Sequence, residues 1–294
     1  MQACKCEHCG HAFRARPRGR HRILCGNSAN AADVARLMAG ELASLVFTSP
    51  PYAQQRDYGE AAKEQVQDWL AMMCGVFAHL PVVKNGQVLV NLGLVHRDGE
   101  WIPYWDPWIE WMRTEGWRRF GWYVWDQGSG LPGDWSGRLG PSHEFVFHFN
   151  KEARKPNHWV EKLEASVRVK SAADQGLRGR DGTIKPVTNP EAFGQTHKIP
   201  DSVVRVTRQQ GPVLHGSESH PAAFSVAFAG FFRRTWLSAG EIHYDPYLGS
   251  ATSVIAGHLG GVRVLGIEME PKFVDLALAR AEAQGLTVER ETDA

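Results

Sequence analysis

Long apolar runs and paired cysteines are scarce in this chain of 294 residues. No segment approaches the roughly 18 consecutive apolar residues that a membrane-spanning helix needs, so the sequence predicts no membrane partner. The first residues, Met-Gln-Ala-Cys-Lys-Cys, lack the apolar core of a signal peptide, which predicts a cytoplasmic protein with reduced thiols. The net charge is only +1. Total charge therefore does not indicate a nucleic-acid partner, and only the distribution of charge can do so.

Cysteine and histidine pairs that could hold a metal are also few. Cys6 and Cys9 form one Cys-x-x-Cys turn, the arrangement that presents two thiolates to zinc. The residues that could complete a site are Cys4, His8, His11 and Cys25. A second well-spaced pair is absent, so the sequence favours a frayed N-terminus bearing Cys4, Cys6, Cys9 and His11 over a structural zinc site. It assigns no metal ligand.

Short apolar runs alternate with helical patterns along most of the chain, and there are no internal repeats. The strands expected from this pattern are 43–48, 87–92, 122–125, 144–149, 241–245 and 263–268, and the expected helices are 31–38, 66–80, 108–114, 222–237, 254–259 and 271–284. Strands that alternate with helices predict an α/β fold, with a mixed, mostly parallel sheet covered by helices on both faces.

Two stretches depart from this alternation. Residues 12–22 form a basic arm that we expect to remain extended. Residues 151–215 show little periodicity and contain twelve lysines and arginines against seven aspartates and glutamates. Irregular segments of this length are usually functional or disordered, so the positive charge is concentrated where a phosphate backbone could bind. A solvated basic loop would have the same composition.

A glycine-containing turn lies between an expected strand and an expected helix. The turn reads Asp245-Pro246-Tyr247-Leu248-Gly249-Ser250-Ala251-Thr252, and the next strand ends at Glu268. Small residues let the backbone approach a ligand, and the following helix offers free N–H groups. A carboxylate about 20 residues later, at the tip of the second strand, is where a Rossmann-like fold holds ribose hydroxyls. The pairing predicts an adenosine-containing cofactor.

A second motif follows the strand at 43–48. It reads Thr48-Ser49-Pro50-Pro51-Tyr52. Consecutive prolines fix the backbone, so their carbonyls can point rigidly into a site. A carbonyl and a hydroxyl can accept both hydrogens of a planar amino group, and Tyr52 supplies a face on which an extracted base can stack. The alternative, a proline-rich cap on a strand, would not account for the whole string.

Both motifs resemble those of the DNA amino-methyltransferases, which methylate adenine N6 or cytosine N4. Further matches surround them: Gly26-Asn27-Ser28 resembles the turn before the catalytic strand, Trp125-Asp126 and Pro141 to Phe147 a late strand beside the active site, and His220-Pro221-Ala222-Ala223-Phe224 the start of a helix under the cofactor. The catalytic motif precedes the cofactor motif, with a basic segment between them. This order resembles the permuted β group, in particular its solitary phage-like members, over about residues 22–285.

The resemblance implies a permuted Rossmann-like methyltransferase fold with an inserted, irregular target-recognition region. It implies domains at 1–25 (a cysteine-containing basic arm), 26–150 (the catalytic half), 151–215 (target recognition) and 216–294 (the cofactor half). The implied catalytic residues are Ser49, Pro50, Pro51 and Tyr52. The implied S-adenosylmethionine-binding residues are Asn27, Thr48, His220, Pro221, Phe224, Asp245, Pro246, Tyr247, Gly249, Ser250, Thr252 and Glu268. Double-stranded DNA is the implied partner, and a homodimer the implied assembly.

Three positions depart from the family pattern. Ala251 stands where the family usually has Gly, Ser225 where it often has Pro, and Asn27 where it has Asp. None removes a catalytic group, but each could weaken cofactor binding. An inactive DNA-binding protein is therefore one alternative, and methylation of RNA or of a protein amide is another. For the target base, Ser49 is typical of cytosine-N4 enzymes, whereas the phage-like resemblance of the rest of the chain leads us to expect adenine-N6.

Overall fold

The computed structural model describes residues 4–5, 12–13, 19–52, 69–97, 99–130, 137–164, 176–186, 194–208, 213–215, 218–220 and 224–291. The chain divides into two compact units. One comprises Met1–Lys155 together with Ser202–Ala294, and the other comprises Pro156–Asp201. The metal-candidate residues Cys6, Cys9 and His11, and the side chain of Cys4, lie outside this description. No described helix has both the length and the apolar character needed to cross a membrane.

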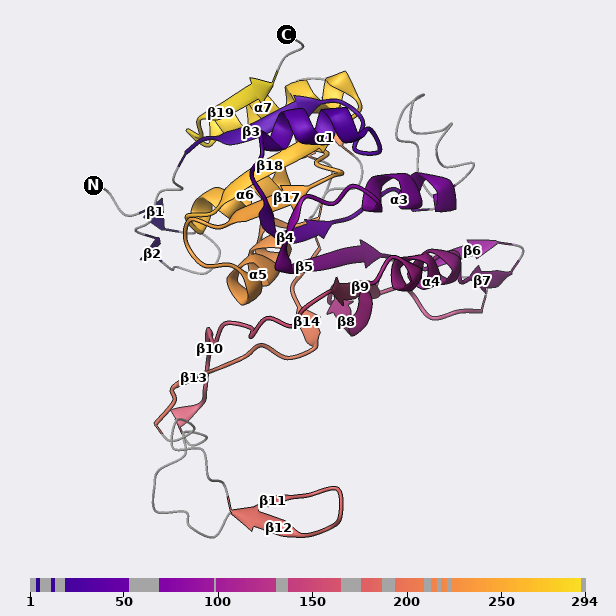
Figure 1. The fold of residues 1–294 in the computed structure, drawn as a ribbon, viewed down its shortest axis with the longest axis vertical. Helices are drawn as coiled ribbons and strands as arrows, with labels where there is room; N and C mark the ends of the chain where they lie inside the picture. The colour runs from indigo at the N-terminus through magenta and orange to yellow at the C-terminus, as the bar shows by residue number, and fades with distance from the viewer. Residues whose placement is uncertain are drawn as a thin grey trace. The chain divides into compact units, whose positions relative to one another are not determined.

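The larger unit is built on one sheet, which has nine strands in the described part of the chain. In spatial order they are β14 (Val203–Arg205), β8 (Arg118–Asp126), β9 (His143–Asn150), β5 (Val82–Leu92), β4 (Ala43–Thr48), β17 (Ile242–Asp245), β18 (Arg263–Glu268), β3 (His21–Cys25) and β19 (Val288–Glu291). Strand β9 is antiparallel to both β5 and β8, and the other neighbours are parallel. In Figure 1, β3 from the N-terminal part of the chain (indigo) lies between β18 and β19 from its C-terminal part.

Helices cover both faces of this sheet. One core contains residues of α1 (Ala31–Met38), α3 (Trp69–Phe77) and α4 (Asp106–Thr114), and two others contain residues of α5 (Val226–Trp236), α6 (Thr252–Leu259) and α7 (Pro271–Ala283). Every residue of β4 is buried, as expected for a strand covered on two sides. This architecture confirms the predicted α/β fold.

The sequence pattern missed three strands of the sheet. Strand β3 places His21–Cys25 between β18 and β19, so the last part of the expected N-terminal arm belongs to the sheet. The short strands β14 and β19 at the two edges were also not predicted. Edge strands bury one side at most, and strands of three or four residues give no measurable periodicity.

Short hairpins complete the larger unit. They pair β1 (Cys4–Lys5) with β2 (Ala12–Phe13), β6 (Val95–Arg97) with β7 (Glu100–Ile102), and β15 (Val213–His215) with β16 (Glu218–His220). The smaller unit contains two antiparallel pairs, β10 (Val160–Glu161) with β13 (His197–Lys198), and β11 (Gly176–Arg178) with β12 (Ile184–Pro186). Both of these pairs lie within the region expected to recognise DNA.

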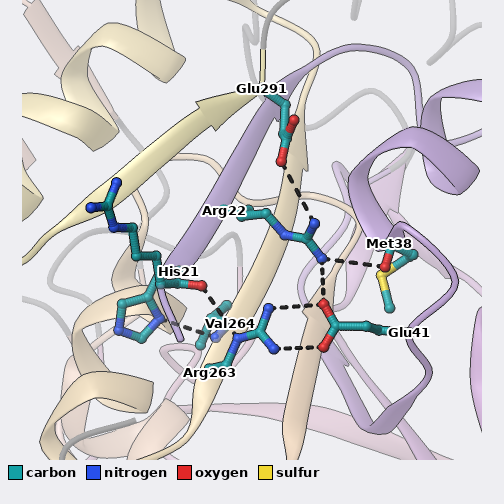
Figure 2. A network of polar contacts seen from close by, with 8 residues as sticks. His21, Arg22, Met38, Glu41, Arg263, Val264 and Glu291 are labelled. Carbon is teal, nitrogen blue, oxygen red and sulfur yellow. Dashed lines mark hydrogen bonds and ion pairs between the residues drawn. The ribbon is translucent and has the colours of Figure 1, made fainter. Parts of the chain in front are cut away.

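An ionic network joins β3, β18 and β19 to the loop before β4 (Figure 2). Glu41 accepts hydrogen bonds from Arg263 Nη1 at 2.5 Å and Arg22 Nη2 at 2.7 Å, and Arg22 also approaches Glu291 at 3.7 Å. The hydrogen bond from Arg263 lowers the pKa of Glu41 below its usual value. The network ties strands β18 and β19 of the cofactor half to β3 and to the loop before β4.

The tryptophans divide between the core and the surface. Trp108, Trp105 and Trp117 are buried, whereas Trp101 and Trp122 are 56% and 62% exposed. The Trp108 ring packs edge-on against Phe77 and Phe149. Trp108 thus anchors α4 in the core.

Candidate active site

The sheet changes its winding direction between β4 and β17. The chain leaves β4, passes through α3 and enters β5 on one side, whereas it leaves β17, passes through α6 and enters β18 on the other. Strands β4 and β17 are parallel neighbours, with Leu45 opposite His243 and Val46 opposite Tyr244. Ligands of open α/β sheets bind outside the carboxyl ends of the strands at such a switch point. The two sequence motifs begin at these two carboxyl ends.

Asp245 joins the two motifs. Its buried carboxylate accepts a hydrogen bond from Thr48 Oγ1 at 2.6 Å and another from Ser253 Oγ, and the backbone N–H of Tyr247 donates to it at 3.2 Å. A buried charge is tolerated when hydrogen-bond donors surround it. The bond from Thr48 therefore fixes the catalytic loop relative to the cofactor loop.

The loop Ser49–Tyr52 follows β4 directly. Pro50, Pro51 and Tyr52 are buried, and Ser49 is half-buried. The indole of Trp69 donates to the Pro51 carbonyl over 2.8 Å, which ties the loop to the start of α3. The string expected to hold a planar amino group is thus anchored at both ends, by Thr48 and by Pro51.

Tyr52 is held through its hydroxyl. Its Oη donates to Glu144 Oε2 at 2.6 Å, and Asn91 Nδ2 donates to the same oxygen at 2.9 Å. Burial, and then the charge of Glu144, raise the pKa of Tyr52 well above its ordinary value. The phenol therefore remains a hydrogen-bond donor at any physiological pH. Sequence reasoning quoted Glu144 only as part of a strand and did not single out Asn91, although a polar residue at the end of apolar β5 was a usable signal.

Glu268 closes the cofactor loop at the tip of β18. It accepts the Gly249 N–H at 2.7 Å on Oε2 and the Glu270 N–H at 3.0 Å on Oε1. Desolvation by burial raises the pKa of Glu268 to about 7, against the lowering effect of these backbone donors. A carboxylate has about four acceptor positions, so two remain for the hydroxyls of a ribose. These open acceptor positions fit the cofactor that the sequence predicts.

The backbone of the cofactor loop has a left-handed residue at Ala251, with φ 58° and ψ 33°. This conformation favours glycine, which explains physically why the family usually has Gly at this position. Arg280, on α7, stabilises the loop by donating from Nη1 to the Ser250 carbonyl at 2.9 Å and to Thr252 Oγ1 at 2.9 Å. Sequence reasoning missed Arg280, because nothing in a helix pattern marks one arginine.

The turn after β3 contacts the same loop. Ser28 Oγ donates to the Pro246 carbonyl at 2.6 Å, and the Gly26 N–H donates to the Glu268 carbonyl at 3.0 Å. Asn27 lies between them, with its Oδ1 accepting the Ala29 N–H and its own N–H donating to Asp33. The structure therefore brings Asn27 to the carboxyl end of β3, next to the strand that ends in Glu268.

Among the described residues, the helix expected to start near His220 begins later. His220 belongs to strand β16, and α5 begins at Val226 with Ser225 as its N-cap, so the prediction that this helix starts at His220 was wrong. Ser225 accepts the Phe228 N–H, which is the N-cap geometry that serine favours. Phe224 packs against Phe47 with ring centroids 5.3 Å apart. Pro221 lies outside the described residues.

The described part of the chain contains no group of three or more His, Cys, Asp or Glu side chains arranged to hold a metal ion. Cys25 and Cys74 are half-buried and form no disulfide among the described residues. Neither belongs to the catalytic or cofactor loop.

Known proteins share this arrangement. Residues 43–279 match the family model described as DNA methylase, which groups N6 and N4 methyltransferases. The type II methyltransferase M.XycI of Xanthomonas campestris pv. cyanopsidis is 25% identical, over 87% of this chain and 86% of that protein. The type II methyltransferase M.PvuII of Proteus hauseri is 24% identical, over 86% of this chain and 82% of that protein.

Solved structures show the same fold. PvuII DNA methyltransferase, described as cytosine-N4-specific, aligns with a TM-score of 0.61 at 19% identity, over 91% of this chain and 89% of its own. The protein TTHA0409 of Thermus thermophilus, complexed with S-adenosyl-L-methionine, aligns with a TM-score of 0.58 at 20% identity, over 93% and 99%. From the family match over most of its length, this chain belongs to the DNA methylase family of N6 and N4 amino-methyltransferases and is an S-adenosylmethionine-dependent enzyme.

Proposed function

We propose that this enzyme methylates the exocyclic amino group of a DNA base that is flipped out against the Ser49–Tyr52 loop. The observation that carries this proposal is the 2.6 Å hydrogen bond from Thr48 Oγ1 to Asp245 Oδ1. It joins the end of β4 to the end of β17, which supports a target amino group and a cofactor bound side by side. Reaction between two such ligands then depends on positioning.

Each residue of the site has a proposed role in that positioning. Ser49 Oγ and the Pro50 carbonyl accept hydrogen bonds from the target amino group, which draws its lone pair out of conjugation with the ring. Tyr52 provides the surface on which the base stacks. Glu268 holds the ribose, and the Gly249 backbone lies along the cofactor. When bound, S-adenosylmethionine supplies an electrophilic methyl group, and no residue needs to form a covalent intermediate.

For the target base we propose cytosine-N4. Ser49 at the first position of the motif is the residue typical of cytosine enzymes, and a related enzyme of known structure, PvuII DNA methyltransferase, is cytosine-N4-specific. We prefer it to the adenine-N6 expectation, which rested on the phage-like resemblance of the rest of the chain. Adenine-N6 remains the second candidate, because that resemblance extends over more residues than the single serine.

Target recognition is assigned to residues 151–215, most of which fall in the separate unit Pro156–Asp201. Lysines and arginines of this segment would contact phosphates, and its Asn, Gln and Arg side chains could read base edges. The homodimer expected from the resemblance also remains a prediction. Light scattering of the purified protein would measure its mass in solution, and a monomer would contradict the prediction.

Sequencing of modified bases tests the proposal. DNA would be taken from cells that lack other DNA methyltransferases and express either the wild type or the Ser49→Ala variant. We expect N4-methylcytosine at one short sequence motif in the first sample and much less in the second. N6-methyladenine at a single motif would replace the proposed base and leave the reaction intact.

A parallel assay compares substrate classes. Methyl transfer from labelled S-adenosylmethionine would be measured with duplex DNA, RNA and protein as acceptors. Transfer to RNA or protein but not to DNA would overturn the proposed substrate. The absence of S-adenosylmethionine binding in calorimetry would instead indicate an inactive DNA-binding protein.

A further inference from the structure

Polar groups from three separate segments meet at the carboxylate of Glu144. Glu144 lies on β9, Asn91 on β5, and Tyr52 on the loop after β4. Glu144 Oε2 accepts from both Tyr52 Oη, at 2.6 Å, and Asn91 Nδ2, at 2.9 Å. Asn91 is 1% exposed, and its Nδ2 also donates to the Phe145 carbonyl at 3.1 Å. Asn91, on β5, therefore holds the Glu144 carboxylate in place independently of Tyr52.

The ring of Tyr52 is confined from a second direction by Gly93. A Cβ atom at this position would lie 2.7 Å from Tyr52 Cε2, closer than real Cβ contacts. Tyr104 Oη donates to the Gly93 carbonyl at 2.9 Å, so the glycine backbone is itself held in place. The ring thus occupies the space that a side chain at position 93 would fill. Its hydroxyl is held at the far end by Glu144.

A bond from phenol to carboxylate is stronger than one between neutral groups. Charge-assisted bonds are short and directional, and the 2.6 Å separation between Tyr52 Oη and Glu144 Oε2 is in that range. Ser49 also hydrogen-bonds to the phenol, so the same oxygen links the first and the last residue of the loop. A change at Glu144 would therefore alter the orientation of the ring and of the serine hydroxyl together.

We propose that Glu144 is a positioning residue, which sets the plane of the Tyr52 ring and the direction of Ser49 before the target base arrives. This inference rests on the proposed function, because it gives Tyr52 the role of stacking surface. Glu144 does not touch the base or the cofactor in this account. It acts through the Tyr52 hydroxyl, and Asn91 keeps its carboxylate in place.

A double-mutant cycle tests this role. The variants are Glu144→Leu, Glu144→Gln, Tyr52→Phe and the double variant Tyr52→Phe/Glu144→Leu. Glutamine retains an oxygen that accepts from the phenol, whereas leucine does not. The double variant removes both partners, so it leaves no buried hydroxyl unpaired and should fold even if Glu144→Leu folds poorly. Glu110→Leu, at an exposed glutamate of α4 in a pair with Arg113, is the control.

The measurements are kcat and KM with genomic DNA from a strain that lacks DNA methyltransferases, the Kd for S-adenosylmethionine, and thermal unfolding. We expect Glu144→Leu and Tyr52→Phe each to lower kcat/KM about tenfold, the factor that one charge-assisted hydrogen bond can supply. The loss should be mainly in kcat. The double variant should be no worse than the singles, Glu144→Gln should stay within about threefold of the wild type, and the Kd for the cofactor should change little.

Several results would overturn the inference. Multiplicative losses in the double variant would mean that Glu144 acts independently of the Tyr52 hydroxyl. A Glu144→Gln enzyme as slow as Glu144→Leu would mean that the charge itself is required, and wild-type rates in Glu144→Leu would mean that the contact has no role. A wild-type enzyme that transfers no methyl group to DNA would instead refute the proposed function, and the same assay separates the two cases.

Discussion

The carboxylates that end the neighbouring strands β17 and β18 have different environments. Asp245 is buried and accepts three hydrogen bonds from Thr48, Ser253 and the Tyr247 backbone. Glu268 accepts only two backbone N–H groups, and burial raises its pKa to about 7. An acceptor whose hydrogen-bonding capacity is already used within the protein stabilises the fold. One that retains free lone pairs is available to a ligand.

The pKa of Glu268 predicts a pH-dependent cofactor affinity. Ribose hydroxyls donate hydrogen bonds to the ionised carboxylate, so binding should strengthen as pH rises through about 7. Between pH 6 and pH 8 the ionised fraction rises about tenfold, which sets the expected decrease in the Kd for S-adenosylmethionine. Calorimetric titrations over this range measure it.

The Glu268→Gln variant is the control for this titration, because it has no proton to lose. It should bind S-adenosylmethionine more weakly than the wild type. Its Kd should not show the decrease between pH 6 and pH 8 that comes from ionisation of Glu268. An identical pH profile in the two proteins would contradict the prediction. The folding stability of the protein without cofactor depends on pH with the opposite sign. Because the pKa of Glu268 is raised in the folded protein, this group favours folding below about pH 4.5, and the contribution is lost as pH rises to about 7.

Helix ends show how local residues define elements. Helix α1 begins after Asn30, whose side chain accepts the Ala32 N–H, and α5 begins after Ser225, which accepts the Phe228 N–H. These residue types are the preferred N-caps, so both starts follow from local chemistry. The C-terminal end of α1 is less favourable. Its cap is Ala39, with φ 47° and ψ 41°, where glycine is usual.

Replacement of Ala39 by glycine should stabilise the protein. Ala39 is exposed, so the substitution loses little packing, and it relieves a left-handed conformation that costs an alanine about 1 kcal/mol. After the entropy of glycine in the unfolded chain is taken into account, we expect a gain of about 0.5 kcal/mol in the free energy of unfolding. Urea unfolding of Ala39→Gly and the wild type measures it.

The matched control is Ala35→Gly, an exposed position inside the same helix. There glycine should lower the free energy of unfolding by about 1 kcal/mol, because the backbone is already in a favourable helical conformation. If both variants were destabilised to the same degree, the left-handed cap at Ala39 would not be a source of strain.

At the scale of the whole molecule, the larger unit contains both proposed ligand loops. The smaller unit, Pro156–Asp201, lies in sequence between the catalytic and cofactor halves. We predict that replacing residues 156–201 by a Gly/Ser linker leaves a folded core. This core should bind S-adenosylmethionine within about threefold of the wild-type Kd, since binding follows contacts that the linker does not alter.

The same variant should lose DNA methylation, because the proposed recognition segment is missing. Calorimetry with S-adenosylmethionine and a methyl-transfer assay on duplex DNA measure the two properties separately. Sequence-specific methylation by the shortened protein would show that recognition lies elsewhere. Failure to fold would show that the inserted unit contributes to the stability of the core.

The sequence predicted the elements that form the centre of the sheet. Strand β4 at 43–48, strand β18 at 263–268 and helix α1 at 31–38 have the bounds that the pattern indicated. A buried strand is a continuous apolar run, and an N-cap residue marks the start of a helix. Both kinds of element can therefore be predicted from a short stretch of sequence. The edge strands β14 and β19 and the start of α5 were not predicted correctly, because short or half-exposed segments take their structure from their neighbours.

The sequence by itself determined the fold class, the family and the two motifs, since these depend on residue order and on local backbone preferences. Only the tertiary structure decided which partners the motif residues have. The bonds from Thr48 to Asp245 and from Tyr52 to Glu144 join residues 197 and 92 positions apart. No local pattern encodes such a pair. The first pair arises because the parallel strands β4 and β17 end together at the switch point. The second arises because antiparallel β9 brings its amino end to the carboxyl end of β5, beside β4. In both places polar groups must find donors or acceptors once water is excluded.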